Sequence, residues 1–318
     1  MKKEHKNVAA SVLARLLAGA QERKEDFNLT LQRYAAERFL FRLGTSRHRE
    51  QFVLKGAMLL ALWGGSLYRA TRDLDLTGYT EDNPRTLIPI IQEICALPCP
   101  DDGLEFLPAT VRAEPIRDES EYHGFRVRLQ AMLEAARVSL QIDIGLGDAI
   151  EPPAQEQEYP VLLDNPAPRI RAYPREAVVA EKFHAMIVLG AANSRYKDFG
   201  DVFVLARHFS FTGPVLARAI AATFERRRTP IPDAQPVALV PAFYSDAKRA
   251  GEWQRYLSRN GLPGAPTDFA AVGELLQAFI RPIWSSLAAN RAFSDTWPPA
   301  GPWAPPTQSR DPRARVTP

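Results

Sequence analysis

The strongest constraint in this sequence is a short segment in which two aspartates alternate with two leucines, Asp73-Leu74-Asp75-Leu76. Successive side chains of a β-strand point to opposite faces, so the two leucines share one face and the two aspartates share the other. Such a strand needs an apolar core on one side and a polar or cationic environment on the other. The segment therefore predicts a half-buried strand that presents two carboxylates side by side.

A second alternating segment, residues 138–144, places Asp143 on the face opposite its apolar residues. If the two strands are neighbours, Asp143 joins the pair. Three carboxylates about 4 Å apart repel by roughly 4 kcal/mol per pair at an effective dielectric of about 20, so such a cluster needs cations. Magnesium prefers carboxylate, water and phosphate oxygens, and two such ions suit phosphoryl transfer. The competing interpretation is that Asp-x-Asp is only the wet face of an amphipathic strand.

The residues around the first aspartate pair favour the chemical interpretation. Lys55-Gly56-Ala57 follows a strand-like segment and opens a helix, so Gly56 lets the backbone approach a ligand while the helix N-terminus offers N–H groups to a triphosphate. An ordinary turn glycine is the alternative. Arg69 and Arg72 flank the carboxylates, where they either steady the triphosphate or offset the acidic cluster.

The order of the periodic segments predicts an α/β (α+β) protein. Two opening helices over residues 7–43 precede a domain with a mixed, largely antiparallel sheet, and helical patterns dominate after residue 174. A stretch rich in Pro, Glu and Gln ends near residue 168. We therefore expect a first domain over 1–168, a helical domain over 169–295 and a disordered Pro-rich tail over 296–318. The predicted strands are 52–54, 73–76, 105–111, 125–129 and 138–144, with a helix over 84–97.

Composition adds exclusions. Forty basic and 37 acidic residues leave a net charge of only +3, so overall charge neither requires nor excludes an anionic partner. Cys95 and Cys99 are too few for a disulfide framework or a zinc site. No apolar run approaches the roughly 20 residues of a membrane span, and no secretory signal is visible. We expect a cytoplasmic protein without a membrane partner.

With these residues in view, the sequence resembles the AbiEii-type nucleotidyltransferase toxins (AbiEii/AbiGii family of type IV toxin–antitoxin systems) of the polymerase-beta-like nucleotidyltransferase superfamily. Residues 52–60 and 68–76 are similar to the family's Lys-Gly-Gly helix opening and its Arg-x-(Ser/Thr)-x-Asp-x-Asp strand. Residues 141–145, 176–182 and 195–201 resemble the second, third and fourth motifs. The ordered set, over about residues 50–205, makes the likeness specific. Ala57 departs from the Gly or Ser usual at that position.

The resemblance implies that Asp73, Asp75 and Asp143 bind two Mg²⁺ ions, that Asp143 draws a proton from the acceptor hydroxyl, and that Lys182 and Asp198 are functional. It also implies a nucleoside triphosphate (NTP) as co-substrate and an RNA acceptor, expected to be the tRNA 3′ end, so that translation is blocked. A separate antitoxin protein and a role in phage defence complete what the family implies.

The residues around Lys182 support a role for it independently. Apolar residues occupy its three- and four-residue neighbours on a helix, so the lysine either reaches solvent or meets an anion such as Asp198 or a triphosphate. Lys182→Met is then expected to lower nucleotide affinity or turnover but not thermal stability. Asp198 and Asp201 share one helix face, where a solvated helix N-terminus is the alternative to function.

Two basic groups are candidates for contact with RNA: Arg226 to Arg228, and a later group that includes Arg249 and is interleaved with Trp253 and Tyr256. Solvated helix faces are the alternative for both. Two other functions stay open for the whole chain. One is nucleotidyl transfer to a small hydroxyl compound such as an antibiotic, or to a protein; the other is a catalytically silent module that binds RNA or an antitoxin.

Overall fold

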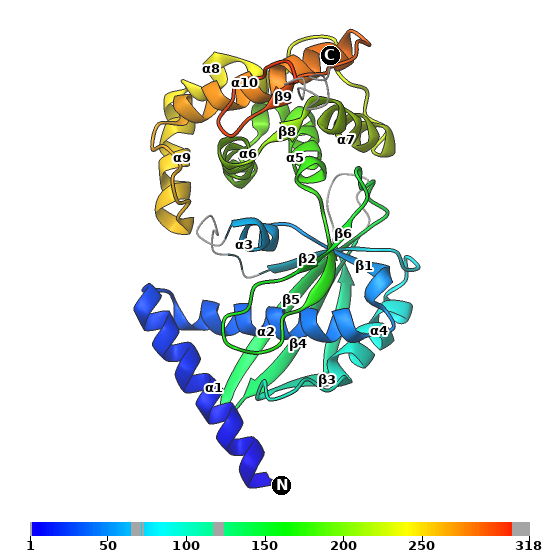
Figure 1. The fold of residues 1–318 in the computed structure, drawn as a ribbon, viewed down its shortest axis with the longest axis vertical. Coiled ribbons are helices and arrows are strands. Elements are labelled where there is room, and N and C mark those ends of the chain that lie inside the picture. The colour runs from blue at the N-terminus through cyan, green and yellow to red at the C-terminus, as the bar shows by residue number, and fades with distance from the viewer. Residues whose placement is uncertain (1, 65–70, 72, 117–123, 307–318) are drawn as a thin grey trace, which may run out of the picture. The chain divides into compact units, whose positions relative to one another are not determined.

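The chain forms two compact units (Figure 1). The computed structural model describes residues 2–64, 71, 73–116 and 124–306, without the side chains of residues 2–7. Within these residues the first unit extends to Val178 and includes Tyr256–Gly264, and the second contains Val179–Arg255 and the chain from Ala265 onward. Strand β7 (Arg169–Ala172) follows the predicted boundary at residue 168 and joins the sheet of the first unit.

The first unit is built on a seven-stranded mixed sheet with strand order β3-β4-β5-β2-β1-β7-β6. The β2–β5 and β1–β7 pairs are parallel, and the remaining neighbouring pairs are antiparallel. This arrangement confirms the predicted α/β class. The other strands are β1 (Phe52–Lys55), β2 (Asp73–Gly78), β3 (Leu104–Pro115), β4 (Gly124–Leu133), β5 (Ala136–Leu146) and β6 (Gln155–Glu158).

The sheet has one apolar and one polar face. Helix α2 (Phe27–Thr45) packs on β5 and β7, and α4 (Pro84–Ala96) packs on β3 and on α2 (Figure 1). Leu74, Leu76 and Ile142 lie on the face that these helices cover and are fully buried. Removing such side chains from water stabilises the fold by roughly 1.5–3 kcal/mol each. The aspartates that alternate with them therefore have to lie on the opposite face.

Capping residues set where these helices begin. Asp26 accepts a hydrogen bond from the backbone N–H of Leu29 at 2.8 Å at the start of α2. Asn83 accepts from the N–H of Arg85 at 2.9 Å, and Pro84 occupies the first turn of α4. Each cap contributes about 1 kcal/mol because it satisfies a backbone donor that the helix leaves unpaired. Helix α1 (Lys2–Arg23) packs on α2.

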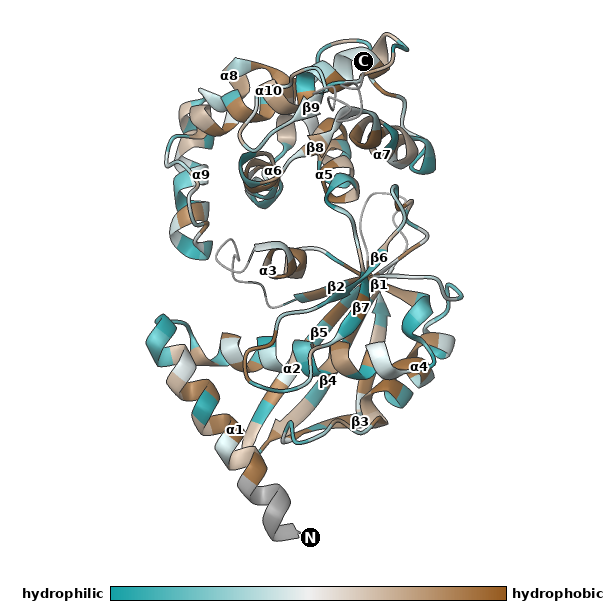
Figure 2. Cartoon of the chain, viewed as in Figure 1, coloured by the Kyte–Doolittle hydropathy of each residue, from teal (hydrophilic) through white to brown (hydrophobic). Residues whose placement is uncertain are grey.

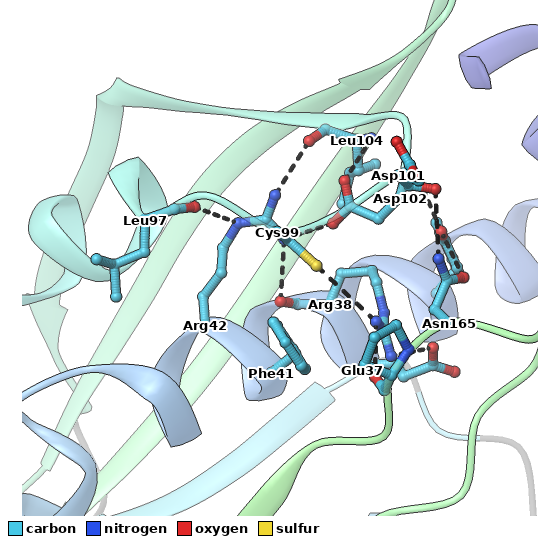
Figure 3. Close-up of polar contacts among 12 residues, drawn as sticks. Glu37, Arg38, Phe41, Arg42, Leu97, Cys99, Asp101, Asp102, Leu104 and Asn165 are labelled. Atoms are coloured by element: carbon cyan, nitrogen blue, oxygen red, sulfur yellow. Dashed lines mark hydrogen bonds and ion pairs between the residues drawn. The ribbon is translucent and has the colours of Figure 1, made fainter. Parts of the chain in front are cut away.

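Two buried arginines connect α2 to distant loops (Figure 3). The Arg42 guanidinium donates to the carbonyls of Leu97 and Leu104 and forms a 2.6 Å ion pair with Asp102. Arg38, with no exposed surface, donates to the carbonyl of Pro166 at 3.0 Å. The segment before β3 and the segment before β7 are thus both anchored to one helix by charged groups.

Asp102→Ala should destabilise the first unit by roughly 3–5 kcal/mol, because it leaves the buried Arg42 cation without its counter-ion. Denaturant unfolding followed by far-UV circular dichroism measures the change. Glu105→Ala removes an exposed carboxylate three residues away on β3 and is the matched control, with an expected change within about 0.5 kcal/mol. Equal stability of the two variants would show that the Arg42–Asp102 pair does not contribute.

Glu37 is a third charged residue in this region. Burial raises its pKa from 4.5 to about 7, against the opposing effect of the adjacent Arg38 guanidinium. Its Oε2 accepts from the backbone N–H of Leu162 at 2.7 Å, and its Oε1 lies 2.7 Å from Arg38 Nη2. Between about pH 4.5 and 7, the folded protein therefore retains a proton here that the unfolded chain loses.

Because the pKa of Glu37 is higher in the folded state, its contribution to stability is fully present below about pH 4.5 and is lost as pH rises through about 7. Glu37→Gln removes this titration. The difference in unfolding free energy between E37Q and the parent should shift in favour of the variant by on the order of 2 kcal/mol between pH 5 and pH 8. Urea unfolding at several pH values tests this, with the exposed Glu22→Gln as the control. A pH-independent difference for E37Q would contradict it.

The C-terminal part of the chain is helical, as the sequence predicts. Phe199 packs against Phe243, Tyr244 and Phe269, and Trp253 stacks on Phe269 with ring centroids 5.3 Å apart. In Figure 2 the longest of these helices, α10, is mainly hydrophobic, whereas α9 is mainly hydrophilic. The helices are α5 (Arg175–Leu189), α6 (Tyr196–His208), α7 (Gly213–Arg226), α8 (Pro241–Tyr244), α9 (Ala247–Asn260) and α10 (Phe269–Ala288).

The Pro-rich C-terminal segment differs from its prediction where the structure describes it. Residues 296–306 are ordered: β9 (Thr296–Trp297) pairs with β8 (Phe211–Thr212), and Trp303 stacks on Phe279 with centroids 5.7 Å apart. The segment is ordered despite its proline content because Trp297 and Trp303 each bury a large apolar area and donate the indole N–H to a backbone carbonyl. Residues 307–318 lie outside the described part. None of the described helices has the length and apolar character that a membrane crossing requires.

Candidate active site

The aspartates singled out from the sequence meet on the polar face of the sheet. Strand β2 pairs in parallel with β5, so that Asp75 lies opposite Asp143 and Asp73 lies opposite Gln141. Leu74 and Ile142, between them, are buried on the other face. This strand pairing is the condition under which a third carboxylate joins the first two, and the structure satisfies it.

On the polar face, five neighbouring strands each contribute one charged residue, and each of these residues lies directly opposite the next in the strand register. We call this set of five residues the charge row. It runs across the sheet from β3 to β1. Side chains at directly opposed positions share a face and lie within interaction distance. Two acidic residues therefore sit at the centre of the row with a cation on either side. In order across the sheet, the row consists of Glu114, Arg126, Asp143, Asp75 and Lys55.

Two of the three aspartates predicted to bind metal, Asp143 and Asp73, accept hydrogen bonds from neighbouring side chains. Arg126 Nε and Nη2 donate to the two oxygens of Asp143 at 2.9 and 2.7 Å, and these bonds raise the pKa of Arg126. Gln141 Nε2 donates to Asp73 Oδ1 at 2.9 Å. Oxygen donors on one face suit a hard cation such as magnesium. As they stand, the described residues include no cluster of three or more His, Cys, Asp or Glu side chains placed to hold a metal ion.

Gly56 is required by the position of Asp75. It has φ +74°, and a Cβ added to it would lie 2.0 Å from Asp75 Oδ2. A side chain at residue 56 would therefore displace the carboxylate as well as strain the backbone. Ala57 is buried just before α3 (Met58–Gly64), so its methyl group faces protein. Arg69 and Arg72, predicted to flank the site, lie outside the described residues.

Lys55 forms an ion pair with Asp148, a residue that the sequence analysis did not single out. Its ammonium forms a 2.6 Å ion pair with Asp148 Oδ2, which also accepts from the hydroxyls of Thr77 at 3.1 Å and Tyr173 at 3.3 Å. Asp148 is nearly fully buried, with 5% of its side chain exposed. The available signal was its place just after the β5 segment, at the end of Gly145-Leu146-Gly147.

Arg126 was also missed, although its strand was predicted. On β4 it alternates with Phe125 and Val127, so period-two patterning already placed it on the polar face. The pattern of a single strand does not say which strand lies beside it. Only the antiparallel pairing of β4 with β5 brings Arg126 opposite Asp143.

The second unit holds the other predicted functional residues in one ion-pair cluster. Lys182 Nζ on α5 lies 2.9 Å from Asp198 Oδ1 and 2.8 Å from Asp201 Oδ2 on α6. Asp198 also pairs with Arg195 at 2.8 Å. The side chains of Asp198 and Asp201 are only 1% and 3% exposed, which excludes a solvated helix N-terminus as their explanation. Lys182 thus meets anions of the chain, one of the options its apolar surroundings left open.

This cluster changes the expected effect of Lys182→Met. The substitution removes a cation that two buried carboxylates share, so the free energy of unfolding should fall by roughly 3–5 kcal/mol. Tryptophan fluorescence during denaturant unfolding reports the change. Lys197→Met removes an exposed lysine from the neighbouring α6 and should leave stability within about 0.5 kcal/mol of the parent. Unchanged stability of K182M would show that the ion pairs are energetically unimportant.

The structure corrects one part of the RNA-binding prediction. Trp253 has no exposed surface and stacks on Phe269, so it is not available to stack on an RNA base. Arg249 lies 4.0 Å from the Phe243 ring centroid and donates to the carbonyl of Asn193 at 3.0 Å. Both residues therefore serve the core of the second unit. Sequence spacing showed an aromatic residue among basic ones but not which face of α9 it occupies.

The fold and the site together define a class. A mixed sheet presents an Asp-x-Asp strand beside a third carboxylate, directly after a strand, a glycine turn and a helix, and this is the framework of a nucleotidyltransferase. The model of the family described as nucleotidyl transferase AbiEii toxin, type IV TA system, matches residues 38–277 of the 318-residue chain. The chain belongs to this family and is a nucleotidyltransferase toxin of a toxin–antitoxin system.

Two solved structures are similar to this chain. JHP933 from Helicobacter pylori is 15% identical with a TM-score of 0.43, and the match covers 80% of this chain and 93% of that one. A second H. pylori protein, described provisionally as a nucleotidyltransferase, is 15% identical with a TM-score of 0.41 and coverages of 80% and 94%. The comparison with curated proteins gives no match.

Proposed function

We propose that this toxin uses Mg²⁺ to transfer a nucleoside monophosphate from an NTP to an RNA acceptor, the 3′ end of a tRNA, and thereby blocks translation. The observation that carries the proposal is the register of β2 and β5, which sets Asp75 opposite Asp143 and keeps Asp73 on the same face. Family membership supports NTP as the co-substrate and a separate antitoxin as the partner. We place the protein in the cytoplasm, where tRNA and NTPs are found, and assign it to phage defence.

The proposed metal ligands are Asp73, Asp75 and Asp143. Two bound ions would neutralise phosphate charge and stabilise the attacking and leaving oxygens of the transfer. The chain itself contributes positioning: Gly56 leaves room for the Asp75 carboxylate, and Lys55, held by Asp148, lies across the strand pair from Asp75. Lys182 and Asp198 are proposed to be functional as well as stabilising, on the strength of their motifs.

The acceptor is the least constrained part of the proposal. Since Trp253 is buried, base stacking by that residue does not contribute, and the remaining support for RNA comes from exposed basic residues such as Arg226 and Arg255. A small hydroxyl compound or a protein would use the same carboxylates. A catalytically silent module has no physical need for three acidic residues that share a face.

Asp75→Ala should lower the rate of transfer by roughly 100-fold or more, because it removes a proposed ligand of the metal ions that stabilise charge in the transition state. The assay incubates the protein with Mg²⁺, each labelled NTP in turn and total bacterial RNA, and then resolves RNA, protein and small-molecule fractions. Asp82→Ala, which removes an exposed aspartate in the loop after β2, is the control and should keep full activity.

The fraction that carries the label decides the acceptor. Label on small RNA that disappears in D75A supports the proposal, and label on protein or on a small compound replaces the RNA acceptor. Full transfer by a folded D75A protein, or transfer that survives removal of divalent ions by a chelator, would overturn the metal-dependent mechanism. No label in any fraction would favour the silent module.

A further inference from the structure

The contact between Arg126 and Asp143 bears directly on how a metal ion reaches the proposed site. The two residues lie directly opposite each other on the antiparallel strands β4 and β5. Both nitrogens of the guanidinium edge engage, at 2.9 and 2.7 Å, one on each carboxylate oxygen. This is the two-pronged geometry in which arginine binds carboxylates most strongly.

A divalent ion at Asp143 needs at least one of these two oxygens. Its approach therefore competes with a charge-assisted hydrogen bond for that oxygen, and it also brings a second cation close to the guanidinium. The pair is only partly exposed, with 35% of the Arg126 side chain and 19% of the Asp143 side chain accessible, so water screens this repulsion incompletely.

Lys55, the other cation of the charge row, is arranged differently. Lys55 lies opposite Asp75 in the strand register, but its ammonium is bound at 2.6 Å by Asp148. Lys55 is therefore held by a carboxylate outside the proposed metal set, whereas Arg126 is held by a carboxylate within that set.

We propose that Arg126 is a positioning residue that keeps Asp143 oriented and withholds it from a bare divalent ion until a triphosphate is bound. A triphosphate brings its own cation and offers the guanidinium other pairs of anionic oxygens, which arginine binds in the same two-pronged way. Binding of metal and of nucleotide is then coupled, and by linkage each raises the affinity for the other. This inference rests on the proposed metal-dependent transfer.

Binding of Mn²⁺ without nucleotide tests the proposal, with electron paramagnetic resonance of free Mn²⁺ as the readout. Arg126→Met removes the guanidinium and keeps an unbranched side chain, and it should tighten Mn²⁺ binding about tenfold, which corresponds to about 1.4 kcal/mol. Arg126→Lys keeps the charge but loses the two-pronged contact, and a smaller gain is expected. R126K also serves as the test if R126M does not fold.

The chain offers a matched control two residues away. Arg128 lies on the same strand and face but pairs with Glu114, so Arg128→Met removes an equal charge without touching Asp143. It should leave Mn²⁺ affinity unchanged. In the R126M/D143N double variant the gain should disappear, because the released carboxylate is no longer there to bind the ion.

Unchanged Mn²⁺ affinity in folded R126M and R126K would overturn the proposal, and so would an equal gain in R128M, which would reveal a general charge effect. The NTP transfer assay with the parent protein separates this result from the proposed function. Mg²⁺-dependent transfer with no effect of Arg126 on Mn²⁺ binding removes the inference alone. A parent protein that transfers without any divalent ion overturns the proposed function, whatever Arg126 does.

Discussion

The parallel pairing of β2 with β5 is the constraint on which the rest of the first unit depends. Because side chains alternate along both strands, one register assigns every apolar residue to the helix-covered face and every acidic residue to the other. A slip of one residue would bury Asp75 and expose Leu74. The hydrophobic core and the proposed chemistry are therefore fixed by the same strand alignment, and neither can change without the other.

Charged groups also organise the interior. Arg38 and Arg42 on α2 donate to the carbonyls of Pro166 and Leu97, which are far apart in sequence. In the second unit, the buried Asp198 forms an ion pair with Lys182. Buried ion pairs contribute little net stability compared with apolar packing, but they tolerate few alternatives because a lone buried charge is costly. We interpret them as devices that fix one arrangement of loops and helices.

Much of this arrangement could be predicted from the sequence, and the reasons are local. Period-two patterns located β2, β4 and β5 and put Asp73, Asp75 and Asp143 on polar faces, because alternation is a property of a single strand. What the sequence alone did not show depends on which segments become neighbours. The ion pair of Arg126 with Asp143 and that of Lys55 with Asp148 both depend on such neighbours.

The same distinction explains two incorrect predictions, one about a helix face and one about the C-terminal segment. Trp253 stands among basic residues in sequence, but the helix turns it toward Phe269. The Pro-rich composition after residue 295 hid the packing of Trp303, because composition counts residues without regard to where a large side chain finds a partner. The proposed roles of Lys182 and Asp198 depend on chemistry, which neither residue spacing nor composition describes.

The placement of the tryptophans has an optical consequence. Of the five, Trp63 alone lies in the first unit, on α3, and the other four belong to the second, where each donates its indole N–H to a backbone carbonyl. Intrinsic emission will thus be dominated by the second unit, while the strand signal in the far ultraviolet comes almost entirely from the first. Fluorescence therefore reports mainly on the second unit, whereas the full far-ultraviolet signal also includes the helices of both units. Any lack of coincidence between the two probes then measures how independently the units melt.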